Sequence, residues 1–144
     1  MAPSPLQYKV ISPPVISSNM HPLLILLHGR GTDENDLLGI ANAFSSDFIF
    51  VSIRGPYAFP YGGYTWFEAD DRGNFNIDQL LSSGDLIIQC LDEIEKTYQV
   101  DPHRTFLFGF SMGAMVSLTT ALFFPQRIKA VVAHSGLLLQ HPRH

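Results

Sequence analysis

The segment Gly109-Phe110-Ser111-Met112-Gly113 has the residue types and the spacing of a serine nucleophile on a sharp turn. It follows the apolar run 105–108 and precedes a stretch of small and apolar residues, which is the strand, turn and helix order of such a site. A serine hydroxyl is a weak nucleophile until a base removes its proton, so it must project to where base and substrate both reach it. We predict that Ser111 is this nucleophile and that its glycine neighbours let strand and helix pack closely. The alternative is that Ser111 only satisfies a turn.

A second glycine-rich turn, His28-Gly29-Arg30-Gly31, follows the apolar run 23–27. Serine hydrolases stabilise the oxyanion with two backbone N–H groups, one from the residue after the nucleophile and one from a loop after an early strand. We expect Met112 and Arg30 to supply these N–H groups as an oxyanion hole. His28, beside the loop, is expected to make structural hydrogen bonds.

The acid and the base of a serine triad are missing after the nucleophile. From Met112 to His144 the sequence has no Asp and no Glu, so a triad in the chain order Ser, Asp or Glu, His cannot be completed. His134 follows an apolar run and could approach Ser111, but no downstream carboxylate would orient its ring. We therefore interpret His134 as an ordinary histidine at the end of a strand.

Apolar runs and periodicity predict the elements that position these residues. Helices are predicted from Thr32 or Asp33, over 83–98 and over 112–124, and Asp101-Pro102 predicts a turn. The continuous apolar run 23–27 is typical of a strand buried on both faces. Strands are predicted over 6–11, 23–27, 48–53, 105–110 and 128–133. Their alternation with helices predicts one α/β domain over 1–144, with a mostly parallel sheet and helices on both faces.

Other candidate sites are weaker. The segment 55–67 contains six aromatic residues and is expected to be a long packed loop. It could line a substrate pocket, with Trp66 as the candidate residue, or its aromatic side chains could serve only to pack it. Asp70, Asp71 and Asp78 are expected to face solvent, so we predict no metal site. Cys90 lies in an apolar helical stripe and is expected to be buried and inert.

Composition excludes several classes of function. The chain has 144 residues, 46% of them hydrophobic, and a net charge of −4 without clusters of Lys or Arg, which excludes nucleic acid and anionic membranes as partners. No apolar run approaches the roughly 18 residues of a membrane span. The single cysteine fits a reducing compartment. We therefore expect a cytoplasmic protein without a membrane span.

Three motifs in this order resemble the phospholipase/carboxylesterase family, which includes acyl-protein thioesterases and small bacterial carboxylesterases. They are His28-Gly29-Arg30-Gly31-Thr32-Asp33-Glu34, Trp66-Phe67-Glu68 and Gly109-Phe110-Ser111-Met112-Gly113-Ala114. The resemblance implies an α/β-hydrolase fold, no cofactor, and hydrolysis of small-molecule carboxylic esters or thioesters through an acyl-enzyme on Ser111. Members of the family are longer, and their triad Asp and His lie beyond the region where this sequence stops. Met112 stands where the acyl-protein thioesterase branch commonly has glutamine.

The sequence ends shortly after the last expected strand. An apolar run, 136–139, leaves that strand and only five residues follow, so we expect the sheet to lack its last strands and to self-associate through the exposed edge. Three explanations are open: an interrupted reading frame, which the uncovered apolar end favours; a partner chain that supplies the remaining strands; or a non-catalytic remnant. The alternative functions are a binding or interaction module on a hydrolase scaffold and an inactive gene fragment. The first explanation predicts that the following DNA encodes two further strands, an Asp and a Gly-His pair.

Overall fold

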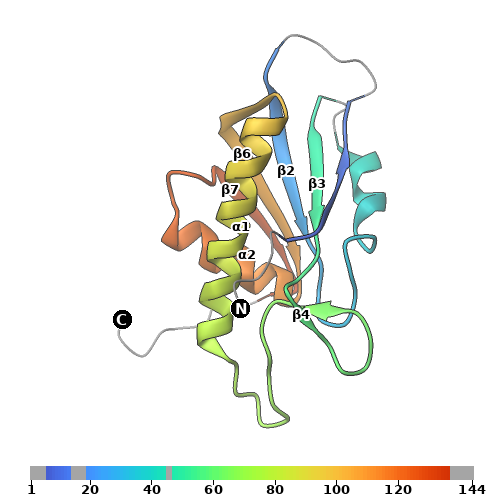
Figure 1. Ribbon diagram of the computed structural model, residues 1–144, viewed down its shortest axis with the longest axis vertical. Coiled ribbons are helices and arrows are strands. Elements are labelled where there is room, and N and C mark those ends of the chain that lie inside the picture. Colours follow the sequence, from blue (N-terminus) through green and yellow to red (C-terminus); the bar gives the residue numbers. More distant parts are fainter. Residues whose placement is uncertain (1–5, 14–18, 45–46, 137–144) are drawn as a thin grey trace.

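The computed structural model describes residues 6–13, 19–44 and 47–136, and a five-stranded sheet forms its centre (Figure 1). The strand order is β1-β3-β2-β6-β7. These strands are β1 (Tyr8–Ile11), β3 (Ile49–Ile53), β2 (His21–Leu27), β6 (Val100–Phe110) and β7 (Ala130–His134). Only β1 runs antiparallel to its neighbour; the other pairs are parallel. The mostly parallel sheet predicted from the sequence is therefore confirmed.

The carboxyl ends of the parallel strands meet at one edge of the sheet. Leu27, the last residue of β2, pairs with Ile53 at the end of β3 and with Gly109 near the end of β6. Phe110 of β6 pairs in turn with His134, the last residue of β7. The segments that follow these strands therefore emerge side by side. In open α/β sheets this is the edge at which ligands bind.

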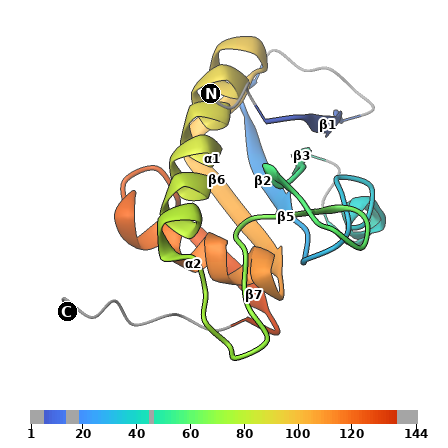
Figure 2. The ribbon, with the colours of Figure 1, turned by 60° about the horizontal axis from the view of Figure 1, so that its bottom comes forward.

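Two α-helices cover one face of the sheet (Figures 1 and 2). The predicted helix over 112–124 is confirmed as α2 (Met112–Phe123). The helix predicted over 83–98 is confirmed as α1 (Ile77–Thr97), but it begins one and a half turns earlier than expected. Asn76 caps it, because its side chain accepts a hydrogen bond from the backbone N–H of Gln79.

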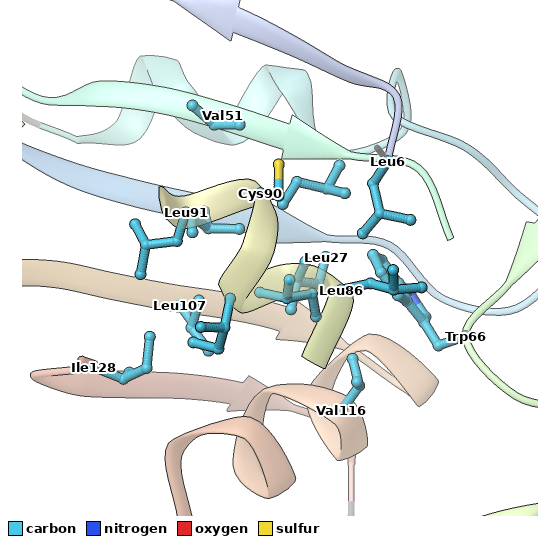
Figure 3. Close-up of a cluster of buried hydrophobic side chains, with 14 of the residues drawn as sticks. Leu6, Leu27, Val51, Trp66, Leu86, Cys90, Leu91, Leu107, Val116 and Ile128 are labelled. Atoms are coloured by element: carbon cyan, nitrogen blue, oxygen red, sulfur yellow. The ribbon is translucent and has the colours of Figure 1, made fainter. Parts of the chain in front are cut away.

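The main hydrophobic core lies between these helices and the sheet (Figure 3). Leu86, Cys90 and Leu91 of α1 point toward the sheet, and Leu27 and Leu107 are the facing strand residues. Spacings of three and four bring these side chains to one side of the helix. Burial raises the pKa of the Cys90 thiol to about 12, so the thiol is buried and unreactive, as predicted.

The opposite face carries, within the described residues, only the 3-10 helix η1 (Leu38–Ala43). Helical segments thus lie on both faces, but the helix predicted from Thr32 or Asp33 is wrong. Asp33 accepts a hydrogen bond from the backbone N–H of Asn35 and closes a turn instead of capping a helix. η1 and its flanking residues cover β2 and β3 and also contact Phe106 and Phe108 of β6, so that among the described residues only the end of β6 and β7 stay open on this face. Phe110 and Val132 are accordingly 39% and 50% exposed.

Two other segments differ from the prediction. The expected long loop over 55–67 contains a hairpin of β4 (Tyr57–Ala58) and β5 (Tyr64–Thr65). The expected turn at Asp101-Pro102 lies inside β6, where the pairing with β2 shifts register. The Asp101 carboxylate accepts a hydrogen bond from the backbone N–H of His103 there, so the turn exists as a bulge in a longer strand.

The predicted apolar run over 137–139 lies outside the described residues. Within the described ranges, no helix combines the length and the apolar character needed to cross a membrane.

Candidate active site

Ser111 occupies a strained turn between β6 and α2. Its φ is 56° and its ψ is −114°, a conformation that residues other than glycine rarely adopt. Two hydrogen bonds hold this turn: Ser111 N donates to His134 O at 2.9 Å, and Met115 N donates to Ser111 O at 3.1 Å. The serine therefore has the strand, sharp turn and helix setting that the motif predicted.

The glycines on either side of Ser111 are required by close packing. A Cβ at Gly113 would overlap the carbonyl oxygen of Leu27, and a Cβ at Gly109 would overlap the carbonyl oxygen of Gly113. The prediction that these glycines let strand and helix approach closely is confirmed. The turn is consequently fixed against the end of β2, from which the second glycine-rich loop leaves.

That second loop lies directly beside the nucleophile candidate. A Cβ at Gly29 would be 3.5 Å from the Cβ of Ser111 and 3.3 Å from the Phe110 ring. In the described part of the chain, the backbone N–H groups of Arg30 and Met112 donate no hydrogen bond. Two backbone N–H groups without a partner among the described residues thus lie in the loop and in the turn that meet at Gly29 and Ser111.

No described side chain makes a hydrogen bond with the Ser111 hydroxyl. His134 instead stacks its ring on Phe110, with centroids 5.4 Å apart, and its Nδ1 lies 3.1 Å from the Ser135 hydroxyl. The structure thus agrees with the interpretation of His134 as a histidine at a strand end.

His28 is buried and holds the loop through three hydrogen bonds. Its Nε2 accepts from the backbone N–H of Gly55 at 2.9 Å, and its carbonyl accepts from the Trp66 indole at 2.7 Å. Because Nε2 is an acceptor, the ring proton sits on Nδ1 and is donated to the carbonyl of Gly29 at 2.6 Å. Burial lowers the pKa of His28, which favours this neutral form. The predicted structural role of His28 is confirmed.

The aromatic segment over 55–67 is divided between the core and the wall of a cavity. Trp66 is fully buried, against the ring and the carbonyl of His28. Next to it a cavity of about 440 Å³ opens beside the loop. Its lining includes Arg30, Phe59, Tyr61, Thr65, Phe67 and Glu68. The structure thus places Trp66 in the core and its sequence neighbours in the wall of the cavity.

Sequence reasoning missed an ion pair below this loop. The Arg54 guanidinium, one residue after β3, donates through two nitrogens to the two carboxylate oxygens of Glu34, each at 2.7 Å. The pair lowers the pKa of Glu34 to about 2. A sequence signal was present, since Glu34 closes the loop motif and Arg54 is a charged residue directly after a buried strand. Nothing local, however, indicated that the two residues meet.

The acidic residues considered for a metal, Asp70, Asp71 and Asp78, are all exposed, as expected. The Asp70 carboxylate accepts hydrogen bonds from the backbone N–H groups of Arg72 and Asn74, which order the turn that they share. Across the described ranges, no group of three His, Cys, Asp or Glu side chains is placed to bind a metal ion.

A mostly parallel sheet whose strand β6 runs into a strained serine turn, with a glycine-rich loop beside it, defines an α/β-hydrolase fold. Residues 7–144 match the phospholipase/carboxylesterase family, and the chain belongs to this family of hydrolases. The resemblance carried by the three sequence motifs is thereby confirmed.

Individual relatives agree with this assignment. The chain is 26% identical over 116 residues to MhqD of Bacillus subtilis, covering 81% of this chain and 58% of the relative. It is 27% identical over 126 residues to acyl-protein thioesterase 1 of Schizosaccharomyces pombe, covering 80% and 55% of the two chains. The crystal structure of the Bacillus cereus carboxylesterase superposes with a TM-score of 0.83 at 25% identity, covering 94% and 62%. The chain thus spans little more than half the length of these curated relatives.

Proposed function

We propose that residues 1–144 belong to one α/β-hydrolase domain that hydrolyses carboxylic esters or thioesters through an acyl-enzyme on Ser111. The strained serine turn is the observation that carries this proposal, because Ser111 combines its φ of 56° and ψ of −114° with a place directly between the end of β6 and the start of α2, and strain of this kind clusters at functional sites. The Ser111 oxygen attacks the carbonyl carbon, the alcohol or thiol leaves with a proton, and water then releases the acid and regenerates the serine.

The backbone N–H groups of Arg30 and Met112 would donate to the oxyanion that forms in both steps. Both are unpaired among the described residues, and the loop and the turn that carry them touch through Gly29 and Ser111. Loss of one such donor typically raises the barrier by about 3 to 4 kcal/mol. Arg30 acts here through its backbone, since its guanidinium lies over the Phe59 ring at 5.3 Å.

The cavity beside Arg30 is the proposed site for a small-molecule substrate's apolar group. Aromatic walls suit an acyl or alcohol group, and Phe59 and Phe67 supply them. Thr65 links this wall to the turn, because its hydroxyl lies 3.5 Å from the Met112 sulfur. We assign substrate contact to Phe59, Thr65 and Phe67, whereas Trp66 packs against His28 in the core. One relative is named a thioesterase and one structural neighbour a carboxylesterase, so the proposal includes both thioesters and carboxylic esters as substrates.

The test is covalent labelling of the folded chain with a fluorophosphonate, followed by mass spectrometry of the peptide that contains Ser111. Since no described side chain activates the hydroxyl, we expect an adduct on Ser111 that accumulates over hours and p-nitrophenyl ester hydrolysis near background. Ser111→Ala should abolish the adduct, whereas Ser135→Ala, which removes a neighbouring hydroxyl, should leave it. A folded chain that gains no adduct on Ser111 at long incubation would overturn the proposal and favour a binding module.

We also propose that the chain self-associates through the exposed edge formed by β7, and that it resides in the cytoplasm. The exposed Val132 of β7 and Phe110 at the end of β6 support the first statement. The second rests on the composition of the sequence alone.

A further inference from the structure

The ion pair between Glu34 and Arg54 lies at the base of the loop over 28–34, which carries the proposed oxyanion donor. Two consecutive residues after β3 reach the two ends of this loop. Gly55 donates its backbone N–H to the His28 ring at the start of the loop. The Arg54 guanidinium donates two hydrogen bonds to the Glu34 carboxylate at the end of the loop. The Glu34 side chain is only 7% exposed, so its charge is not shared with solvent.

Arg54 also holds the segment that pairs with the middle of the loop. Gly31 N donates to Tyr64 O at 2.8 Å, and Tyr64 N donates to Thr32 O at 2.7 Å. The Arg54 guanidinium donates to the Tyr64 hydroxyl at 3.2 Å and lies 4.4 Å from the centre of its ring. The hairpin therefore joins the loop to the same guanidinium that binds its end.

These contacts fix the direction of one peptide bond. The His28 ring holds the carbonyl oxygen of Gly29, and that oxygen belongs to the same trans peptide as the N–H of Arg30. In a trans peptide the oxygen and the N–H point in opposite directions, so an anchored oxygen determines where the N–H points. If Arg54 and Glu34 were unpaired, rotation of this peptide would be opposed by the His28 bond and by the two bonds of Tyr64 to Gly31 and Thr32, and Tyr64 would itself have lost its contact with the guanidinium.

We propose that Glu34 and Arg54 are positioning residues: their ion pair fixes the far end of the loop over 28–34 and so keeps the Arg30 N–H directed at the oxyanion. This role rests on the proposed function of the Arg30 N–H. Neither side chain touches substrate. The pair acts by holding the loop against the end of β3 and against the β4–β5 hairpin.

The first measurement is residue-resolved amide hydrogen exchange, which does not depend on catalysis. Arg54→Gln should speed exchange at Gly31 and Tyr64 by about tenfold or more, while amides in the middle of α1 keep their rates. Glu34→Gln retains the volume of the side chain and should show the same pattern if Arg54→Gln does not fold. The matched control is Arg104→Gln, which breaks the pair of Arg104 with Asp101 at the other end of β6. Unchanged exchange at Gly31 in both variants would overturn the proposal.

The second measurement is the rate of Ser111 labelling. Displacement of an oxyanion donor should lower the maximal labelling rate constant by about 10- to 100-fold and leave the half-saturating probe concentration nearly unchanged. Arg54→Lys keeps the charge but cannot make the two parallel hydrogen bonds of the guanidinium. Its labelling rate constant should therefore fall between those of wild type and Arg54→Gln. Faster exchange with a wild-type labelling rate would also overturn the positioning role. A wild-type chain without any adduct would refute the proposed function, and the exchange data alone would then decide whether the pair holds the loop.

Discussion

Glu34 is a buried carboxylate whose main partner is Arg54. The hydrogen bonds from Arg54, with smaller contributions from its own backbone N–H and from Lys9, outweigh burial and lower the pKa of Glu34 from 4.5 to about 2, a shift equivalent to about 3 kcal/mol of stabilisation. Because the pKa in the folded protein is below that in the unfolded chain, this stabilisation is fully present above pH 4.5. It is lost as the pH falls from 4.5 toward 2, where Glu34 becomes protonated in both states.

The pH dependence of stability should therefore reveal this pair. Wild type should be more stable than Arg54→Gln above pH 4.5, and the difference in the free energy of unfolding should shrink as the pH falls toward 2. Other groups, including His28, titrate in both proteins and cancel in the difference. Denaturant unfolding at a series of pH values measures this, and parallel curves for the two proteins would show that Glu34 and Arg54 are not coupled.

At the level of single residues, local motifs were predictable and long-range contacts were not. The strain at Ser111, the crowding at Gly109 and Gly113 and the structural role of His28 follow from the residue types of two short segments. The Glu34–Arg54 pair joins positions 20 residues apart through tertiary structure. Likewise, which aromatic side chains of 55–67 line the cavity depends on the twist of a hairpin that the sequence did not indicate.

Among the elements, α2 and the end of β2 form the tightest contact near the site. Gly113 faces the carbonyl oxygens of Leu27 and His28 directly. Alanine normally stabilises a helix relative to glycine by about 1 kcal/mol, but at this position its methyl group would have to displace backbone. We expect Gly113→Ala to lower the free energy of unfolding by about 3 kcal/mol or more.

The control for this substitution is Gly39→Ala, because a Cβ at Gly39 meets no atom within 4 Å. Gly39→Ala should be neutral or slightly stabilising in the same urea unfolding experiment. Equal effects of the two substitutions would mean that the closeness of α2 to β2 does not constrain the fold.

Strands and long helices were predictable because their apolar patterns reflect burial, and the buried run of β2 is the clearest case. The errors lie where a local hydrogen bond decides the boundary. Asn76 caps α1, and Ile77 and Leu80 extend its apolar stripe back to that cap, which the prediction from 83 left out. Asp33 closes a turn that postpones η1. Residue type alone does not distinguish these two roles, since an Asx side chain can cap a helix or a turn.

For the whole molecule, the covering of the sheet is uneven in the described residues. α1 and α2 bury one face, whereas on the other face β7 and the end of β6 leave Val132 and Phe110 in contact with solvent. Parallel sheets are normally covered on both faces. An apolar face of this kind favours contact with a second copy of the chain.

Self-association should therefore depend on this face. We expect light scattering after size exclusion to show species larger than a monomer, and Val132→Lys to weaken association by about tenfold or more, since burial of a valine is worth about 1.5 to 3 kcal/mol. Met20→Lys is the matched control, because Met20 is also 50% exposed and directly precedes β2, at the opposite end of that strand from the serine turn. A wild-type monomer at all concentrations, or equal effects of both substitutions, would contradict this prediction.

The backbone at Ser111 also has an evolutionary consequence. A residue with a Cβ at φ 56° and ψ −114° costs about 1 to 3 kcal/mol, out of a typical net stability of about 5 to 15 kcal/mol. Glycine would relieve this strain, so selection for stability alone would favour glycine over serine at position 111. Under the proposed function, descendants that abandon hydrolysis should therefore lose Ser111 first and keep Gly109 and Gly113. A sequence with glycine at position 111, and with Gly109 and Gly113 retained, would mark a lineage that kept the fold after it lost the proposed reaction.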